Sequence, residues 1–262
     1  MKIKKYFFVL ITVCLLVSVM AAYAGAETTL TVDEIMDKVE ETSPDSTTQK
    51  TISEMILIDQ NGKEEVREMV MFSQEGENEK SSTLVRFLSP KSVKDVTLLN
   101  IDDGEKIYLY MPAYNKPRRI AGSSKSEEFM GTGLSYEDMS MDYKDKDKDY
   151  KKTLLEETDE EYIVEVLPSG EDVSYEKIIL HVDKENYYAK KVEFYKVINE
   201  LTKTLSINKI KVDDKGKVTP MEIAFTDMLE NRVTKIVIKE IEYNIELPSG
   251  FFSIRTLSKP TL

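Results

Sequence analysis

Three extended segments in series, between residues 84 and 111, constrain the fold more than any other part of the chain. Residues 84–90 and 93–101 are apolar runs, and a third run at 106–111 follows the turn Asp102-Asp103-Gly104. An Asp-Gly pair suits hairpin turns, because their central residues need a positive φ. The chain therefore pairs antiparallel here.

Similar extended runs occupy most of the rest of the chain. Turn residues separate them, including Asn61-Gly62, the other strong hairpin turn. The runs are residues 47–59, 64–73, 151–156, 162–167, 175–182, 187–198, 202–212, 218–229 and 232–243. We expect about eleven strands, and a sheet of that size must curl or split. The motif Leu247-Pro248-Ser249-Gly250-Phe251-Phe252 should then tuck two phenylalanines against the sheet.

One helix is predicted near the start of the chain. Thr31 is a good N-cap, and Glu34 follows three residues later as its capping-box partner. The helix should end before Ser43-Pro44, because the residue before a proline avoids the α region. Its apolar stripe is Val32, Ile35, Met36 and Val39.

Several strands carry apolar residues on both faces, whereas a half-buried antiparallel sheet has one polar face. This is so in residues 55–58, 69–72 and 107–111. Two apolar faces need two coverings. We therefore predict an α+β domain, mainly antiparallel β, built as a strongly curved incomplete β-barrel that encloses the N-terminal helix and a helical lid segment.

The concave face of such a sheet could keep an apolar cavity. Methionine suits a cavity lining, because its unbranched thioether adapts to variable contents, and ten of the twelve methionines follow residue 26. An ordinary packed core is the alternative for each of these residues. The candidate lining residues are Met55, Met69, Met71, Leu109, Met111, Phe129 and Met130.

A basic segment, residues 115–120, precedes about twenty residues with three glycines and little alternation. We call residues 122–143 the lid segment, since a long stretch without strands in a strand-rich chain is usually functional. Lys116, Arg118 and Arg119 could contact an anionic lipid headgroup or an acidic partner, since arginine gives bidentate contacts. Equally, they could pair with lid acids and hold the lid shut, the candidates being Glu127, Glu128, Glu137 and Asp138.

The same region resembles the outer-membrane lipoprotein-sorting (LolA-like) proteins, over about 60 residues of dense match. The motifs are Phe87-Leu88-Ser89-Pro90, Ile101-Asp102-Asp103-Gly104, Leu109-Tyr110-Met111-Pro112, Lys116-Pro117-Arg118-Arg119-Ile120, Phe129-Met130-Gly131 and Ser135-Tyr136-Glu137-Asp138. The resemblance implies a soluble envelope carrier that shields acyl chains of lipids or lipoproteins without catalysis.

The first 26 residues are predicted to be a secretory signal peptide. Lysines precede an apolar run, and small residues place cleavage near Ala24 or Ala26. Residues 27–262 then form a single domain without cysteine, in the periplasm or cell envelope. Removing Lys2, Lys4 and Lys5 from 36 basic against 48 acidic residues leaves a net charge of −15. That excess argues against nucleic acid as a partner.

Catalytic and metal-binding motifs are scarce. His181 is the single histidine, so a zinc site built on several histidines is excluded and a Ser-His-Asp triad would have to use this one residue. We expect His181 to face the surface. Asp145, Asp147, Asp149 and Glu156 imitate calcium-loop spacing, but Tyr150 stands where the loop needs glycine. We therefore predict no metal, no cofactor and no enzyme activity, although a carboxylate-based hydrolase stays a remote possibility.

Two hypotheses of different class remain. The first is the lipid or lipoprotein carrier, a monomer with a possible transporter or other envelope membrane protein as partner. The alternative is a β-rich interaction module that docks on an envelope membrane protein and has its interior filled by side chains.

Overall fold

The computed structural model describes residues 30–76, 80–140, 150–168, 175–197 and 199–259. The fold described below is that of the unit Val32–Leu262. Its core is a thirteen-stranded sheet in which every neighbouring pair of strands is antiparallel.

The elements follow one another along the chain in nearly the predicted order. The first half contains α2 (Val32–Glu41), β1 (Thr48–Ile58), β2 (Glu64–Glu75), β3 (Ser81–Ser89), β4 (Thr97–Ile101), β5 (Lys106–Met111), β6 (Lys116–Ile120) and the short 3-10 turns η1 (Gly122–Ser126) and η2 (Asp138–Ser140). The second half contains β7 (Lys151–Glu157), β8 (Glu161–Leu167), β9 (Lys177–Asp183), β10 (Ala189–Val197), β11 (Glu200–Val212), β12 (Val218–Asp227), β13 (Arg232–Tyr243) and α3 (Ile254–Leu257).

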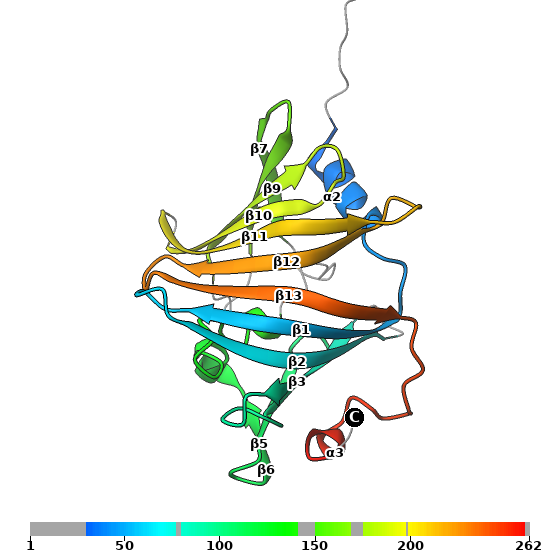
Figure 1. The fold of residues 1–262 in the computed structure, drawn as a ribbon. Coiled ribbons are helices and arrows are strands. Elements are labelled where there is room, and N and C mark those ends of the chain that lie inside the picture. The colour runs from blue at the N-terminus through cyan, green and yellow to red at the C-terminus, as the bar shows by residue number, and fades with distance from the viewer. Residues whose placement is uncertain (1–29, 77–79, 141–149, 169–174, 198, 260–262) are drawn as a thin grey trace, which may run out of the picture. The chain divides into compact units, whose positions relative to one another are not determined.

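The strand order is β6-β5-β4-β3-β2-β1-β13-β12-β11-β10-β9-β8-β7, so the first and last strands of the chain pair at the centre of the sheet. The sheet curls without closing, and its free edges are β6 and β7 (Figure 1). These edge strands are consecutive in sequence. The connection between them must therefore pass from one edge of the sheet to the other, and it contains the lid segment.

The predicted hairpin turns are confirmed. Asp102, Asp103 and Gly104 have φ values of 55°, 55° and 81°, and Gly62 has a φ of 79°. Asp102 and Asp103 are both left-handed, as a type I′ turn needs, whereas in the other hairpin only Gly62 is left-handed, after the turn that begins at Asp59.

The helix α2 also begins and ends as predicted, and its Ile35 is fully buried. It packs against β7. Just past its end, the Thr42 hydroxyl donates to the Tyr187 carbonyl at 2.8 Å, and the Val218 amide donates to the Thr42 carbonyl at 2.7 Å. The helix is therefore fixed to the β7–β12 half of the sheet.

Both faces of the β1–β6 half are covered, as two apolar faces require. On the convex face, Phe251 lies 5.0 Å from Phe72, between ring centroids, and Leu257 is fully buried. This convex cluster confirms that the C-terminal phenylalanines pack on the sheet. The lid segment covers the opposite, concave face and lies behind β13 and β1 in Figure 1.

Three details differ from the sequence prediction. The basic segment is a strand, β6, because it pairs with β5 from Ile107–Ile120 to Met111–Lys116. Strand β4 begins at Thr97, since Asp95 has a φ of 64° and interrupts the extended chain. The described part of the lid segment has only the two short turns η1 and η2 as helical structure.

Candidate functional site

The concave face of the sheet can be traced by the pairing register, since residues directly opposite each other in antiparallel strands share a face. Met55 pairs with Ile236 on one side and with Arg67 on the other. Ile236 pairs in turn with Ile223. The same face therefore runs continuously across β2, β1, β13 and β12.

All seven predicted lining residues lie together on this face or on the lid above it. Met55, Met69, Leu109 and Phe129 are buried in one apolar cluster, which we call the concave cluster, and three others pack against it at partial exposure, namely Met71, Met111 and Met130. In the described structure these side chains contact one another. Whether they line a ligand site stays a prediction.

Aromatic rings join the lid to the sheet in this cluster. Phe129 of the lid stacks on Phe87 of β3 with 5.7 Å between ring centroids, and Tyr136 lies 5.5 Å from Phe129. Phe87 and Phe129 are both fully buried. The aromatic side chains of the lid therefore cover apolar residues on the concave face of the sheet, which the strands alone would leave exposed.

Polar groups fix the backbone of the lid to the β2 and β4 strands. The Arg67 guanidinium donates to the Met130 carbonyl at 2.7 Å, and the Asn100 amide donates to the Met139 carbonyl at 3.0 Å. Arg67 and Asn100 are themselves buried. Buried backbone carbonyls need such partners, so these bonds set the height of the lid above the sheet.

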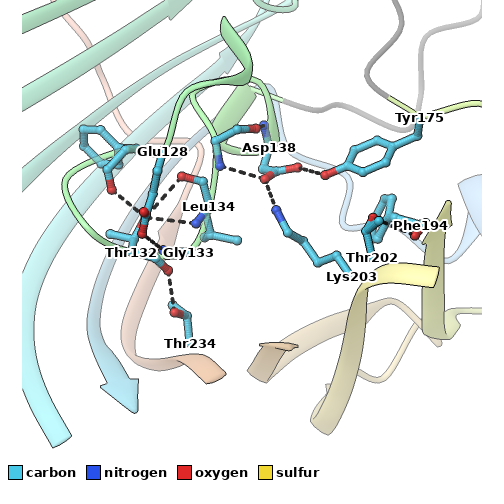
Figure 2. Close-up of polar contacts among 12 residues, drawn as sticks. Glu128, Thr132, Gly133, Leu134, Asp138, Tyr175, Phe194, Thr202, Lys203 and Thr234 are labelled. Atoms are coloured by element: carbon cyan, nitrogen blue, oxygen red, sulfur yellow. Dashed lines mark hydrogen bonds and ion pairs between the residues drawn. The ribbon is translucent and has the colours of Figure 1, made fainter. Parts of the chain in front are cut away.

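A polar latch holds the far end of the lid to the other half of the sheet (Figure 2). Asp138 forms an ion pair with Lys203 of β11 and accepts a hydrogen bond from the Tyr175 hydroxyl at 2.8 Å. It also accepts from the Ser135 amide at 2.7 Å. The Asp138 side chain is only 4% exposed, so the carboxylate depends on these three donors for its solvation.

The tip of the lid is fastened to β13. The Thr234 hydroxyl donates to the Thr132 carbonyl at 2.5 Å, and Arg232 forms an ion pair with Glu128 at 3.0 Å. Gly133 has a φ of 70°, and its amide donates to the Glu128 carboxylate at 2.6 Å. The tight turn needs glycine, because L side chains rarely adopt this conformation.

The latch predicts a measurable local stability for the lid. Exchanging Lys203 for Met should speed amide hydrogen exchange at Phe129 and Thr132 about tenfold, because a charge-assisted bond to the buried carboxylate is lost. Those two amides bond within the lid, to Leu134 and to Phe129. Lys209→Met, on an exposed position of the same strand, is the control. Equal exchange in both variants would contradict the latch.

Beyond the lid, the concave face carries an apolar strip that is only half buried. Its residues lie on β11, β12 and β13 and share the face of Met55 by register, and they are Ile207, Ile223, Phe225, Ile236 and Ile238. On a fully packed face these large apolar side chains would be buried. The strip therefore leaves apolar surface available on the inside of the curl.

A pocket of about 180 Å³ lies under the lid tip, at the end of this strip. Its walls are the β1–β2 turn, the start of β13 and the lid, and they include Leu57, Lys63, Gly131, Thr132, Gly133 and Arg232. Leu57 also packs against the concave cluster. The pocket therefore shares one wall residue, Leu57, with the surroundings of the concave cluster, and several of its other wall residues are polar or charged.

Three of the four lid acids expected to pair with the basic segment have partners outside it. Glu128 pairs with Arg232, Asp138 pairs with Lys203, and Glu127 accepts from Ser124. Arg118 instead hydrogen-bonds the hydroxyl of Tyr136, and burial raises the pKa of this tyrosine although the Arg118 charge opposes that shift.

His181 lies on β9 between two glutamates and is about 16% exposed, so it is more enclosed than a surface residue. Its Nδ1 lies 3.2 Å from Glu161 and its Nε2 lies 3.6 Å from Glu193. Burial alone would raise the pKa of Glu161, but hydrogen bonds from Lys190 and His181 outweigh it and lower that pKa. These groups form an ion-pair cluster on the convex face.

Metal binding finds no support among the described residues. They contain no group of three or more His, Cys, Asp or Glu side chains placed to hold an ion. The calcium-like aspartates Asp145, Asp147 and Asp149 lie outside the described residues, and Glu156 is an exposed residue of β7. Within the same limits, no helix is long and apolar enough to cross a bilayer.

Comparison with known proteins identifies a family and solved structures that share this architecture. A family model described as an uncharacterized protein matches residues 79–259, which is more than half of the chain. The chain belongs to this family. The matched part runs from the start of β3 to the C-terminal segment, so it includes the lid and both coverings of the sheet. A search of curated proteins gave no match.

Solved structures share the fold of the family member described here. A domain of an outer membrane lipoprotein-sorting protein from Vibrio parahaemolyticus is similar at 25% identity and a TM-score of 0.78, over 86% of this chain and 97% of that one. A DUF1329 family protein from Desulfovibrio piger is similar at 24% identity and a TM-score of 0.77, over 88% of this chain and 100% of that one.

A LolA superfamily protein from Nitrosomonas europaea has 22% identity and a TM-score of 0.68, over 86% of this chain and 98% of that chain. The resemblance to the lipoprotein-sorting proteins is therefore confirmed, and so is the strongly curved, incomplete antiparallel barrel.

Proposed function

We propose that this protein is an envelope carrier that shelters acyl chains of lipids or lipoproteins between the lid segment and the concave face, without catalysis. The observation that carries the proposal is the half-buried apolar strip, which shares Ile236 with the concave cluster and extends that apolar face over β11, β12 and β13. Similarity to a lipoprotein-sorting domain supports the same class of cargo. Export through cleavage near Ala24 or Ala26 belongs to this proposal.

The lid is held to the sheet by the apolar contacts of Phe129 and Tyr136 and by separate polar bonds. Most of its anchors to the sheet are single hydrogen bonds or ion pairs, and each is worth about 1–3 kcal/mol at most. An acyl chain that buries about 300 Å² would contribute roughly 7 kcal/mol before ordering costs. Cargo of this kind would take over apolar contacts that the lid side chains Phe129 and Met130 now make in the concave cluster, which offsets part of the cost of moving them.

The proposal is tested by native mass spectrometry of the protein purified from its own envelope. A co-purified lipid of defined mass supports a carrier. A clean mass, together with no uptake of a fluorescent fatty acid by the delipidated protein, would favour an interaction module with a filled interior. Turnover of the offered lipid would instead indicate an enzyme.

Two adjacent residues of β13 offer a matched pair of variants. Ile238 pairs with Ser53 and faces the concave side, whereas Val237 faces the convex side, and both are half buried. Ile238→Lys should weaken fatty-acid binding at least tenfold, because it places a charge in the apolar strip. Val237→Lys should leave binding within about twofold. Equal effects would remove the concave strip as the site.

A further inference from the structure

The two free edges of the sheet differ in charge. Edge strand β7 carries Lys151 and Lys152 at one end and Glu156 and Glu157 at the other, so its charges balance. Edge strand β6, with the turn before it, carries three cations and no acid over residues 111–120. Lysine and proline protect an exposed edge strand from pairing with other chains. A net positive charge is not needed for this protection, because the other edge strand, β7, has none.

Neighbouring elements add to the positive charge beside β6. Thr97 pairs with both Arg86 and Tyr110, and Tyr110 pairs with Pro117. This register places the β3–β4 loop next to the β5–β6 turn. The exposed cations of the β3–β4 loop and of β6 are Lys91, Lys94, Lys116, Arg118 and Arg119, and we call this set the basic edge. Helix α3, with exposed Arg255, packs against β4 and β5.

The tip of the β5–β6 hairpin also presents an aromatic ring. Tyr114 is 70% exposed and precedes Lys116 by two residues, and the hairpin forms one end of the sheet (Figure 1). Tyrosine beside lysine and arginine is the combination enriched where proteins meet the headgroup layer of a membrane. Because the Tyr114 ring is exposed, it contributes little to the packing of the core.

The cations of the basic edge are available for an external partner. Within the described residues, neither Lys116 nor Arg119 forms an ion pair, and the lid acids Glu128 and Asp138 are paired elsewhere. The whole chain has a net charge of −12, so a general electrostatic attraction to anions is excluded. Screening limits the repulsion from distant acids to about 10 Å, so a local cluster can still act.

We propose that the basic edge docks this protein on the surface of an anionic phospholipid bilayer, with Tyr114 at the headgroup layer. An extended bilayer surface fits five cations spread over a loop and an edge strand. It also fits a tip that carries an exposed aromatic ring. The docking is independent of cargo binding, and it would bring a carrier into contact with the membrane that supplies or receives lipid.

Vesicle flotation of the cargo-free mature protein tests the proposal. The protein should float with phosphatidylcholine vesicles that contain phosphatidylglycerol, and much less with pure phosphatidylcholine, and added salt should abolish binding. Lys116→Gln combined with Arg119→Gln should lower the partition coefficient about 30-fold, the equivalent of roughly 2 kcal/mol at about 1 kcal/mol per cation. This variant keeps the Arg118–Tyr136 contact.

The control variant removes the same charge from the opposite edge, by Lys151→Gln with Lys152→Gln. It should float like the wild type. Equal losses in both double variants would reduce the effect to net charge and overturn the proposal, as would equal flotation with both vesicle types. An acidic protein captured through Lys116 and Arg119, without any vesicle binding, would also overturn it. Because no cargo is present, failure here leaves the carrier proposal untouched.

Discussion

Uptake of a fluorescent fatty acid should fall below detection once the lid is cross-linked to β13. Glu128 and Arg232 meet at 3.0 Å between a carboxylate oxygen and a guanidinium nitrogen, so a pair of cysteines at these positions can be joined by a short bifunctional thiol reagent. The mature chain has no other cysteine, because Cys14 precedes the predicted cleavage sites. The cross-link would keep Phe129 in the concave cluster, so an acyl chain could not enter between the lid and that cluster.

The same double-cysteine variant without the reagent is the control for the lost ion pair. It should bind at least as well as the wild type, because opening the lid then costs less. A cleavable reagent adds a second control, since cleavage should restore uptake. Undiminished uptake in the cross-linked protein would mean that cargo does not enter beneath the lid tip, and the proposed site would be wrong.

The sequence was sufficient for most of the fold because local signals agreed with each other. The Asp102-Asp103-Gly104 and Asn61-Gly62 turns fix two hairpins, and two-sided apolar strands require two coverings, which the structure supplies. The strand β6 was missed because Lys116-Pro117-Arg118-Arg119 has no apolar alternation. Pairing with β5 forms it, and tertiary context of this kind overrides weak strand propensity.

The polar half of the candidate site was harder to predict. Arg67, Lys203 and Thr234 each lie on the concave face of a strand, where at least one of the residues two positions away is apolar. A polar residue in such an alternating apolar pattern is the signal that could have identified them. The partners could not be predicted, because Asp138 lies in the lid segment and Lys203 lies on β11, 65 residues further along the chain, so that the two meet only when the chain folds. For the same reason, the sequence did not show that Glu128 and Asp138 pair with Arg232 and Lys203.

Exchange of Arg86 for Leu should lower the free energy of unfolding by about 3 kcal/mol or more. Arg86 lies on the convex face and is only 3% exposed. Its guanidinium donates to the Thr97 hydroxyl at 2.9 Å and to the carbonyls of Lys259, Leu257 and Thr256 at 2.8, 3.1 and 3.2 Å. Burial lowers the pKa of Arg86, and the nearby charge of Asp95 opposes that shift.

The large effect is expected because one side chain satisfies several buried acceptors and also fixes the C-terminal segment on the sheet. Leucine would fill part of the volume but leave those carbonyls without donors, and Phe251 and Leu257 would lose their fixed position over Phe72.

Urea unfolding measures the lost free energy of unfolding. Arg255→Leu removes an exposed arginine from the same segment and should change stability by less than about 0.5 kcal/mol. Arg86→Lys should fall between the two, since an ammonium keeps the charge without the planar fork. A stability of Arg86→Leu equal to that of Arg255→Leu would show that the convex covering is held by apolar contacts alone.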